Sequence, residues 1–237
     1  TIAISEPVRE HLLRDFRVPA ERIRLIPHGI DTAPFETPVD PAEARRLREQ
    51  AGLPPEGCVV GTVARLVASK GVEQLVRSFP RIRAAVPKAH LLIVGDGEER
   101  PRLQRLAARS GVGDAVHFAG TLPQTRVALS LMDVVVFLPA EQEGFGLSLL
   151  EAMACGRPLV AVRRGGGAPW VLDQGGAAAL VEPGDPEGLA GAVTRLLTNG
   201  EFACRAAGEA RAIVKKRFSL SRMVDQVEAV YRELVDR

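Results

Sequence analysis

The chain has 237 residues, 46% of them hydrophobic, which is enough for one large domain or two small ones. Its 31 Lys and Arg residues nearly balance its 29 Asp and Glu residues, so the net charge of +2 implies neither a nucleic acid nor an anionic membrane as a partner. No apolar run reaches the ~18 residues of a membrane-spanning helix.

The first part of the chain predicts a small α/β segment followed by a linker. Thr1–Ser5 is expected to form a strand, and Ser5 is expected to cap a helix at Glu6–Phe16. Ile23–Pro27 predicts a second strand. Residues 33–39 are rich in Pro and Thr without periodicity, which is typical of a linker. Because the sequence begins without Met and inside an expected strand, we interpret it as a fragment that starts within a longer protein.

From residue 40 onward, helical and strand patterns alternate. Apolar runs predict strands at Cys58–Val63, His90–Val94, Ala115–Phe118, Val134–Leu138, Leu159–Val162 and Ala178–Val181. Amphipathic or capped stretches predict helices at Asp40–Ala51, Gly71–Val86, Glu98–Arg109, Gln124–Leu131, Leu147–Cys155, Pro186–Thr198, Glu201–Arg217 and Ser219–Asp236. This alternation predicts a Rossmann-like α/β fold, a parallel sheet with helices on both faces, followed by C-terminal helices.

Polar, glycine-rich stretches follow several of the predicted strands. They are Gly61–Lys70, Gly95–Gly97, Gly120–Leu122 and Glu141–Gly146. In parallel sheets, ligands bind at the carboxyl ends of the strands, near the point where the strand order reverses. We therefore expect these stretches to converge on one cleft. Three consecutive glycines at residues 165–167 likewise predict a close approach of two backbone segments.

Residues 141–161, which read EQEGFGLSLLEAMACGRPLVA, form the most informative stretch of the chain. Gly144 and Gly146 allow the backbone to turn sharply after an apolar strand, and Leu147–Cys155 predicts a short helix. A helix N-terminus at the end of a parallel strand offers unpaired backbone N–H groups and the positive end of the helix dipole. Such a terminus suits a phosphate group or a sugar hydroxyl.

Four charged side chains are expected near this turn. Arg65 and Lys70 lie in a loop after a predicted strand, where they could clamp a diphosphate, although two surface cations near a loop are also common. Glu143 could contact a ligand or merely favour the helix dipole. Glu151 could be an ordinary polar helix residue, but its neighbours are mostly apolar, and a carboxylate there needs a partner such as a ligand hydroxyl.

The sequence contains no pattern typical of a metal site or a disulfide framework. The cysteines Cys58, Cys155 and Cys204 are odd in number and lack C-x-x-C spacing. His28 and His117 are expected to be structural rather than catalytic. We therefore predict a site without a metal ion, in a reducing, cytoplasmic environment.

These motifs resemble the carboxyl-terminal, donor-binding half of the retaining glycosyltransferases of family 4 (glycosyl transferases group 1), which have the GT-B architecture. The resemblance covers nearly the whole chain and is most specific in the paired-glutamate motif at 143–158. The matching stretches are Ile4–Glu6, Ile26–Asp31, Arg65 with Lys70–Gly71, Val94–Gly97, Phe118–Gly120 and Glu143–Pro158.

The resemblance implies transfer of a hexosyl group, with retention, from a UDP-, GDP- or ADP-sugar, without a metal or other cofactor. It implies that Arg65 and Lys70 hold the donor diphosphate and that Glu143 contacts the donor sugar, and we predict these three as catalytic residues. The other donor contacts that it implies are Gly144 and the backbone of Phe145 and Gly146 at the sugar, Leu147 along the nucleoside, Glu151 at the ribose hydroxyls and Leu122 near the base.

The resemblance also divides the chain into three parts. Residues 1–34 would be a remnant of an N-terminal, acceptor-binding domain with its linker, and residues 35–217 the domain that binds the nucleotide sugar. Residues 218–237 would be a helix that packs back on the N-terminal domain. We therefore expect the chain to be inactive alone. The acceptor would be a glycan, a lipid or a small molecule, and the full-length protein could associate peripherally with the inner face of a membrane.

Trp170 departs from the family pattern, in which a glutamate is common after the glycine-rich turn. This departure and the expected lack of an acceptor domain leave open a non-catalytic nucleotide-binding or scaffold module. A nucleotide-sugar epimerase of the same architecture is a further alternative, but that class shares the stretch from Glu143 to Glu151 less closely.

Overall fold

The computed structural model describes residues 1–139, 143–163, 166–172 and 179–235 of the chain. Some residues named in the sequence analysis lie outside the described residues. They are Glu141, where the glycine turn was expected to begin, Gly165, the first of the three glycines, and Ala178 and Asp236, each at the end of a predicted element.

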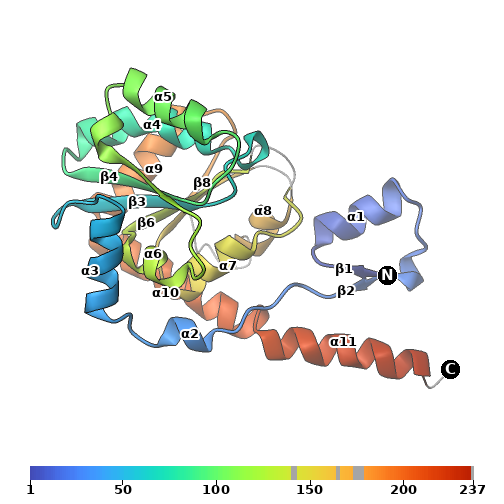
Figure 1. Cartoon of the computed structure of the whole chain (residues 1–237). Helices are drawn as coiled ribbons and strands as arrows, with labels where there is room; N and C mark the ends of the chain where they lie inside the picture. The colour runs from blue at the N-terminus through green and yellow to red at the C-terminus, as the bar shows by residue number, and fades with distance from the viewer. Residues whose placement is uncertain (140–142, 164–165, 173–178, 236–237) are drawn as a thin grey trace.

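A six-stranded sheet forms the centre of the molecule, and all of its neighbouring strands run parallel (Figure 1). The strand order is β5-β4-β3-β6-β7-β8. The strands are β3 (Cys58–Val63), β4 (Ala89–Val94), β5 (Val116–Gly120), β6 (Val134–Phe137), β7 (Leu159–Val162) and β8 (Ala179–Val181). Because β3 and β6 are neighbours in space, the strand order reverses between them, and this pair is the topological switch point.

Helices cover both faces of the sheet, because successive side chains of each strand point to opposite faces. In β3, Val60 belongs to one buried cluster and Val59 to the other. The first face packs on α4 (Val72–Ala85), α5 (Arg100–Arg109) and α9 (Pro186–Thr198). The second packs on α3 (Pro41–Gln50), α6 (Arg126–Leu131), α7 (Leu147–Ala154), α8 (Gly167–Leu172) and much of α10 (Gly200–Arg217). The predicted Rossmann-like architecture is confirmed.

The N-terminal segment forms a separate small unit beside the main sheet (Figure 1). Its two strands, β1 (Ile2–Ala3) and β2 (Arg24–Leu25), pair in parallel and are connected through α1 (Glu6–Arg14). The Oγ of Ser5 accepts a hydrogen bond from the backbone N–H of Val8 (3.4 Å), which confirms the predicted helix cap.

The linker predicted at residues 33–39 contains a short helix that its sequence did not indicate. Ala33–Glu36 forms a single helical turn, α2. The carboxylate of Asp31 accepts a hydrogen bond from the backbone N–H of Ala33 (3.0 Å), and Pro34 stands in the first turn, where its missing N–H costs nothing. A four-residue helix is too short to produce a hydrophobic period, so its sequence pattern does not differ from that of a loop.

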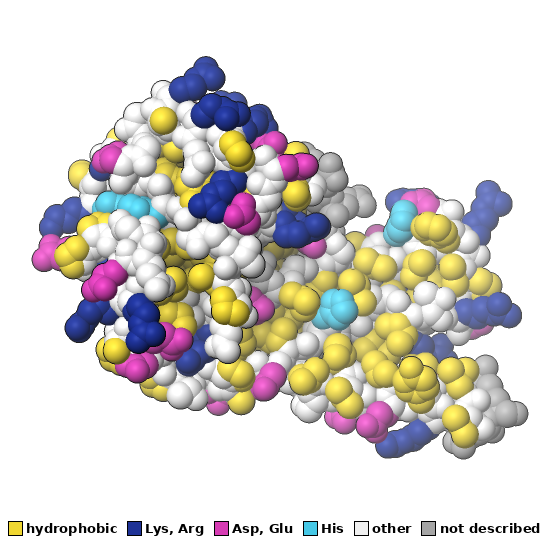
Figure 2. Space-filling view, in the orientation of Figure 1, with side chains coloured by type: hydrophobic (Ala, Val, Ile, Leu, Met, Phe, Trp, Pro, Cys, Tyr) yellow, Lys and Arg dark blue, Asp and Glu magenta, His cyan; other side chains and the backbone are white. Residues whose placement is uncertain are grey.

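The last helix, α11 (Leu220–Val235), lies beside the N-terminal segment (Figure 1). The backbone of Ile30 pairs with that of Phe218 and Leu220 (both 2.9 Å), and Arg24 forms an ion pair with Glu233 (3.0 Å). None of the residues of α11 is buried. Figure 2 shows hydrophobic side chains gathered over this part of the surface. Among the described helices, none has both the length and the apolar character needed to cross a membrane.

A pair of histidines lies near the amino ends of the strands, at the end of the sheet opposite the predicted cleft. Nδ1 of His90 in β4 and Nε2 of His117 in β5 lie 3.0 Å apart. Burial is the main cause that lowers the pKa of both imidazoles. Arg83 and Arg48 lower the pKa of His90 further, while the nearby Asp114 opposes the shift. The folded state therefore favours the neutral histidines.

We expect acid to destabilise the fold through this pair. A depressed pKa in the folded state means that the stabilisation is complete above the unfolded value of about 6.5 and is lost as the pH falls through the lower folded pKa values. Thermal melts between pH 8 and pH 5 should show a falling midpoint. The variant His117→Gln should flatten this dependence, whereas His11→Gln, on the exposed surface of α1, should preserve it. A midpoint that is independent of pH in the unmodified chain would contradict this account.

Candidate functional site

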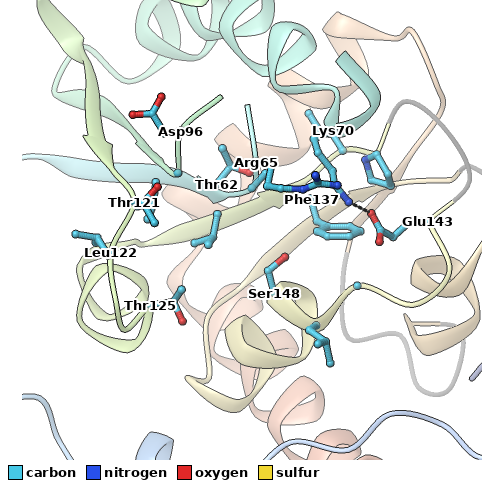
Figure 3. A pocket seen from close by; sticks show the side chains of 18 residues that line it. Thr62, Arg65, Lys70, Asp96, Thr121, Leu122, Thr125, Phe137, Glu143 and Ser148 are labelled. Atoms are coloured by element: carbon cyan, nitrogen blue, oxygen red, sulfur yellow. Dashed lines mark hydrogen bonds and ion pairs between the residues drawn. The ribbon is translucent and has the colours of Figure 1, made fainter. Parts of the chain in front are cut away.

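A hollow of about 520 Å³ lies at the carboxyl ends of β3, β4 and β6, at the switch point of the sheet (Figure 3). Its walls are the segments that directly follow these strands, together with the loop after β5 and the beginning of α7. The lining residues include Thr62–Arg65, Lys70, Val94–Asp96, Thr121, Leu122, Thr125, Phe137–Pro139, Glu143 and Gly146–Ser148. The sequence prediction that the strand-end stretches converge on one cleft is confirmed by this lining.

The charged wall of the hollow combines residues from both sides of the switch point. Lys70 ends a short 3₁₀ turn after β3, and its Nζ forms an ion pair with Oε2 of Glu143, which follows β6 (Figure 3). Both side chains are about three-quarters buried, with 24% and 22% exposed. Arg65 lies beside this pair in Figure 3, is exposed, and forms no ion pair with any described residue. Its charge is therefore available to an anion in the hollow.

Other parts of the fold hold the turn that carries Glu143. The carbonyl of Glu143 accepts a hydrogen bond from the N–H of Gly167 (2.7 Å), and the carbonyl of Gly144 accepts one from Oγ of Ser5 (2.7 Å). A Cβ on Gly167 would lie 2.4 Å from Cα of Phe145. The glycines at 166–167 thus permit the close backbone approach that the sequence predicts. The N-terminal segment and α8 therefore fix the turn from two sides.

The side chain of Phe145 is buried away from the hollow. It is 2% exposed and lies in an aromatic cluster with His28, Trp170 and Phe218, with ring centroids 5.3 to 6.3 Å away. Trp170, the residue that departs from the family pattern, therefore packs behind the turn. His28 has the structural setting that the sequence predicts, since its ring packs edge-on against Phe145.

Glu151 lies one layer behind the wall of the hollow, in α7. Burial raises the pKa of its carboxyl group, and a hydrogen bond that it accepts from Oγ1 of Thr125 (2.8 Å) acts in the opposite direction. Thr125 itself lines the hollow (Figure 3). The carboxylate therefore has the partner that its apolar surroundings require. The sequence analysis missed Thr125, which it placed inside the predicted helix Gln124–Leu131, whereas the helix begins at Arg126.

The structure thus places most of the predicted site residues around one hollow. Those that line it are Arg65, Lys70, Leu122, Glu143, Gly146 and Leu147. Gly144 and Phe145 belong to the turn without lining the hollow, and Glu151 lies behind the lining, next to Thr125. Within the described residues, no group of three or more His, Cys, Asp or Glu side chains could hold a metal ion. The roles implied for these residues, and the absence of a metal requirement, stay predictions.

The chain is therefore a doubly wound α/β domain with a hollow at the switch point of its sheet, where ligands bind in folds of this class. It belongs to the family described as glycosyl transferases group 1, whose sequence model matches residues 43–213. Among curated proteins, it is 38% identical over 223 residues to a D-inositol 3-phosphate glycosyltransferase of Acidothermus cellulolyticus, covering 90% of this chain and 48% of that protein. It is 30% identical over 235 residues to the alpha-D-kanosaminyltransferase of Streptomyces kanamyceticus, covering 98% of this chain and 60% of that protein.

Solved structures show the same fold. A crystal structure of HepE from Anabaena in complex with UDP-glucose superimposes with a TM-score of 0.88 at 26% identity, over 98% of this chain and 63% of that one. A glycosyltransferase from Rickettsia africae superimposes with a TM-score of 0.92 at 22% identity, over 99% of this chain and 63% of that one. The chain thus spans about half to two thirds of the length of these relatives.

We expect the two glycines of the turn to respond differently to replacement by alanine. Gly146 has φ 95°, and an added Cβ would lie 2.8 Å from the ring of Phe137, so Gly146→Ala should destabilise the fold by about 1–3 kcal/mol. An added Cβ on Gly144 would meet Cδ1 of Ile4 at an ordinary 3.5 Å, so Gly144→Ala should be tolerated within about 1 kcal/mol. Chemical denaturation of the two variants measures the difference, and equal stabilities would contradict the role of Gly146.

Proposed function

We propose that this chain supplies the donor site of a glycosyltransferase that moves a hexosyl group from a nucleoside diphosphate sugar to an acceptor, with retention of configuration. The supporting observation is the meeting of Arg65, Lys70 and Glu143 in one hollow at the beginning of α7. The family supports a glycosyltransferase. Among the relatives, a mannosyltransferase of Mycolicibacterium smegmatis is GDP-mannose-dependent, and HepE was crystallised with UDP-glucose.

The charges of the hollow suit the chemistry of glycosyl transfer. Breaking the bond to the sugar develops negative charge on the departing diphosphate and positive charge on the ring. The guanidinium of Arg65 can pair with phosphate oxygens through two hydrogen bonds, and the ammonium of Lys70 adds a point charge. Two cations and a helix N-terminus would stabilise the leaving group without a metal ion.

The ion pair between Lys70 and Glu143 gives the donor a way to rearrange the site. Its diphosphate would take the place of the carboxylate as the partner of Lys70. The carboxylate of Glu143 would then be available to the hydroxyl groups of the donor sugar, to which a carboxylate can act only as an acceptor. Leu147, 48% exposed at the rim, and Leu122 in the loop after β5 would contact the nucleoside, and Glu151 would accept a hydrogen bond from the ribose.

The acceptor would bind a part of the full-length protein that this chain does not contain, since the chain spans 48–63% of the relatives described above. The hydrophobic face of α11 and the N-terminal segment, with Val224 41% and Tyr231 67% exposed, would pack against that part. The acceptor would be a glycan, a lipid or a small molecule, handled in the cytoplasm or at the inner face of the membrane.

Nucleotide binding tests the donor site directly. Isothermal titration calorimetry with UDP, GDP and ADP should detect at least one of them. Lys70→Ala and Arg65→Ala should each weaken its binding by about 10- to 100-fold, because a hydrogen bond to a charged group contributes about 1.5–3 kcal/mol. The matched controls Lys88→Ala and Arg105→Ala remove exposed cations that do not line the hollow and should change nothing. If none of the nucleotides binds, or if the site variants bind like the controls, the proposal is wrong.

We also expect the isolated chain to bind a donor without transferring its sugar. The physical reason is that the acceptor must be held against the anomeric carbon, and the surface that would hold it lies outside the chain. Product analysis of mixtures of nucleotide sugars with candidate acceptors should detect no glycoside with this chain and a glycoside with the full-length protein. Turnover by the isolated chain would refute this division of labour.

A further inference from the structure

Thr125 stands at the N-cap position of α6 but does not cap it. Its backbone is helical, with φ −81° and ψ −19°, and its side chain makes no capping hydrogen bond. A threonine at this position usually accepts a hydrogen bond from one of the first N–H groups of the helix, which contributes about 1 kcal/mol. Here the hydroxyl instead donates to Oε2 of Glu151 in α7, at 2.8 Å.

The Glu151 carboxylate depends on this contact. Its neighbours in α7, Leu150 and Ala152, are both 0% exposed, and burial is the main cause that raises the pKa of its carboxyl group. The bond from Thr125 is the only hydrogen bond that its side chain makes among the described residues, and it involves Oε2 alone. Oε1 is therefore left as an acceptor, in a carboxylate whose orientation is set by one hydroxyl group.

We propose that Thr125 is a positioning residue that aims the Glu151 carboxylate at the ribose of the donor and thereby makes the site prefer ribonucleotides to deoxyribonucleotides. This inference rests on the donor site proposed above. Thr125 lines the hollow between Leu122 and the beginning of α7 (Figure 3), where the nucleoside would lie. Because one oxygen of Glu151 is held by Thr125, the other can accept a ribose hydroxyl without the cost of first ordering the side chain.

The hydrogen bond also favours the charged form that can accept from a ribose hydroxyl. A carboxylate accepts hydrogen bonds with both oxygens, whereas the protonated acid has less acceptor capacity. Replacing Thr125 with valine preserves the shape of the side chain and removes only the hydroxyl donor. The carboxyl group would then be half-buried with no partner, would sample other rotamers, and would be protonated more readily. Each of these effects weakens the ribose contact and leaves the diphosphate contacts in place.

A comparison of ribose and deoxyribose ligands tests this role. Calorimetry on the full chain would use UDP, GDP and ADP, and then the 2′-deoxy and 3′-deoxy forms of each nucleotide that binds. The unmodified chain should bind the ribonucleotide about 10-fold more tightly than at least one deoxy form, as expected for one hydrogen bond to a charged group. Thr125→Val should reduce this ratio to about 1, and Thr125→Ser should restore it. Competition by inorganic pyrophosphate should be the same in the unmodified chain and in Thr125→Val.

The controls separate positioning from folding and from the donor site itself. Thr198→Val makes the same chemical change on the exposed surface of α9 and should leave the ratio unchanged. Thermal melts establish that each variant is folded. An unchanged ratio in Thr125→Val, or no rescue by Thr125→Ser, would overturn the role of Thr125 while nucleotide binding remained. A chain that binds nucleotides without preferring ribose would overturn the ribose contact of Glu151, and a chain that binds no nucleotide would overturn the proposed donor site and this inference with it.

Discussion

The ion pair between Lys70 and Glu143 joins the two halves of the sheet across its switch point. Lys70 follows β3, from which the chain proceeds to one edge of the sheet, and Glu143 follows β6, from which it proceeds to the other. The reversal of strand order leaves the segments after β3 and β6 without a crossover helix between them, and the hollow forms there. Two opposite charges of this kind, mostly shielded from water, attract each other more strongly than a pair on the surface. An anionic ligand that separates them must therefore offer Lys70 an equally good partner.

The position of Glu143 depends on segments that are remote in the sequence. Ser5 is fully buried, and its hydroxyl reaches the carbonyl of Gly144 across 139 positions of the chain, while α8 holds the carbonyl of Glu143 from the opposite side. Behind the turn, Phe145 packs with His28 and Phe218, which belong to the connections before α2 and before α11. A shift of the N-terminal segment or of α11 could therefore move Glu143 through these packing contacts, without a change in the sheet.

Thr125 and Glu151 illustrate how a hydrogen bond favours the ionised form of a buried carboxyl group. A carboxylate surrounded by apolar side chains tends to take up a proton, and one hydrogen bond from a hydroxyl group counteracts that tendency. Because the Thr125 hydroxyl makes this bond, it does not cap α6. A residue that lacks its usual local hydrogen bond and instead bonds a side chain remote in the sequence is expected near a binding site. Elsewhere, the local preference of the residue would prevail.

The sequence alone determined the class of fold, since alternating apolar strands and amphipathic helices have few ways to bury both faces of a sheet. It also identified the glycines at 146 and 166–167 as places of sharp turning or close approach, where an added Cβ would come too close to neighbouring atoms. The short helix at 33–36 could not be predicted, because one helical turn is too short to show a hydrophobic period. Only the tertiary structure decided that Lys70 meets Glu143, that the side chain of Phe145 points away from the hollow, and that Thr125 holds Glu151. Lys70 and Glu143 are 73 positions apart and Thr125 and Glu151 are 26 apart, and which side chains meet at such separations is decided by the packing of the whole sheet and its helices rather than by any local pattern.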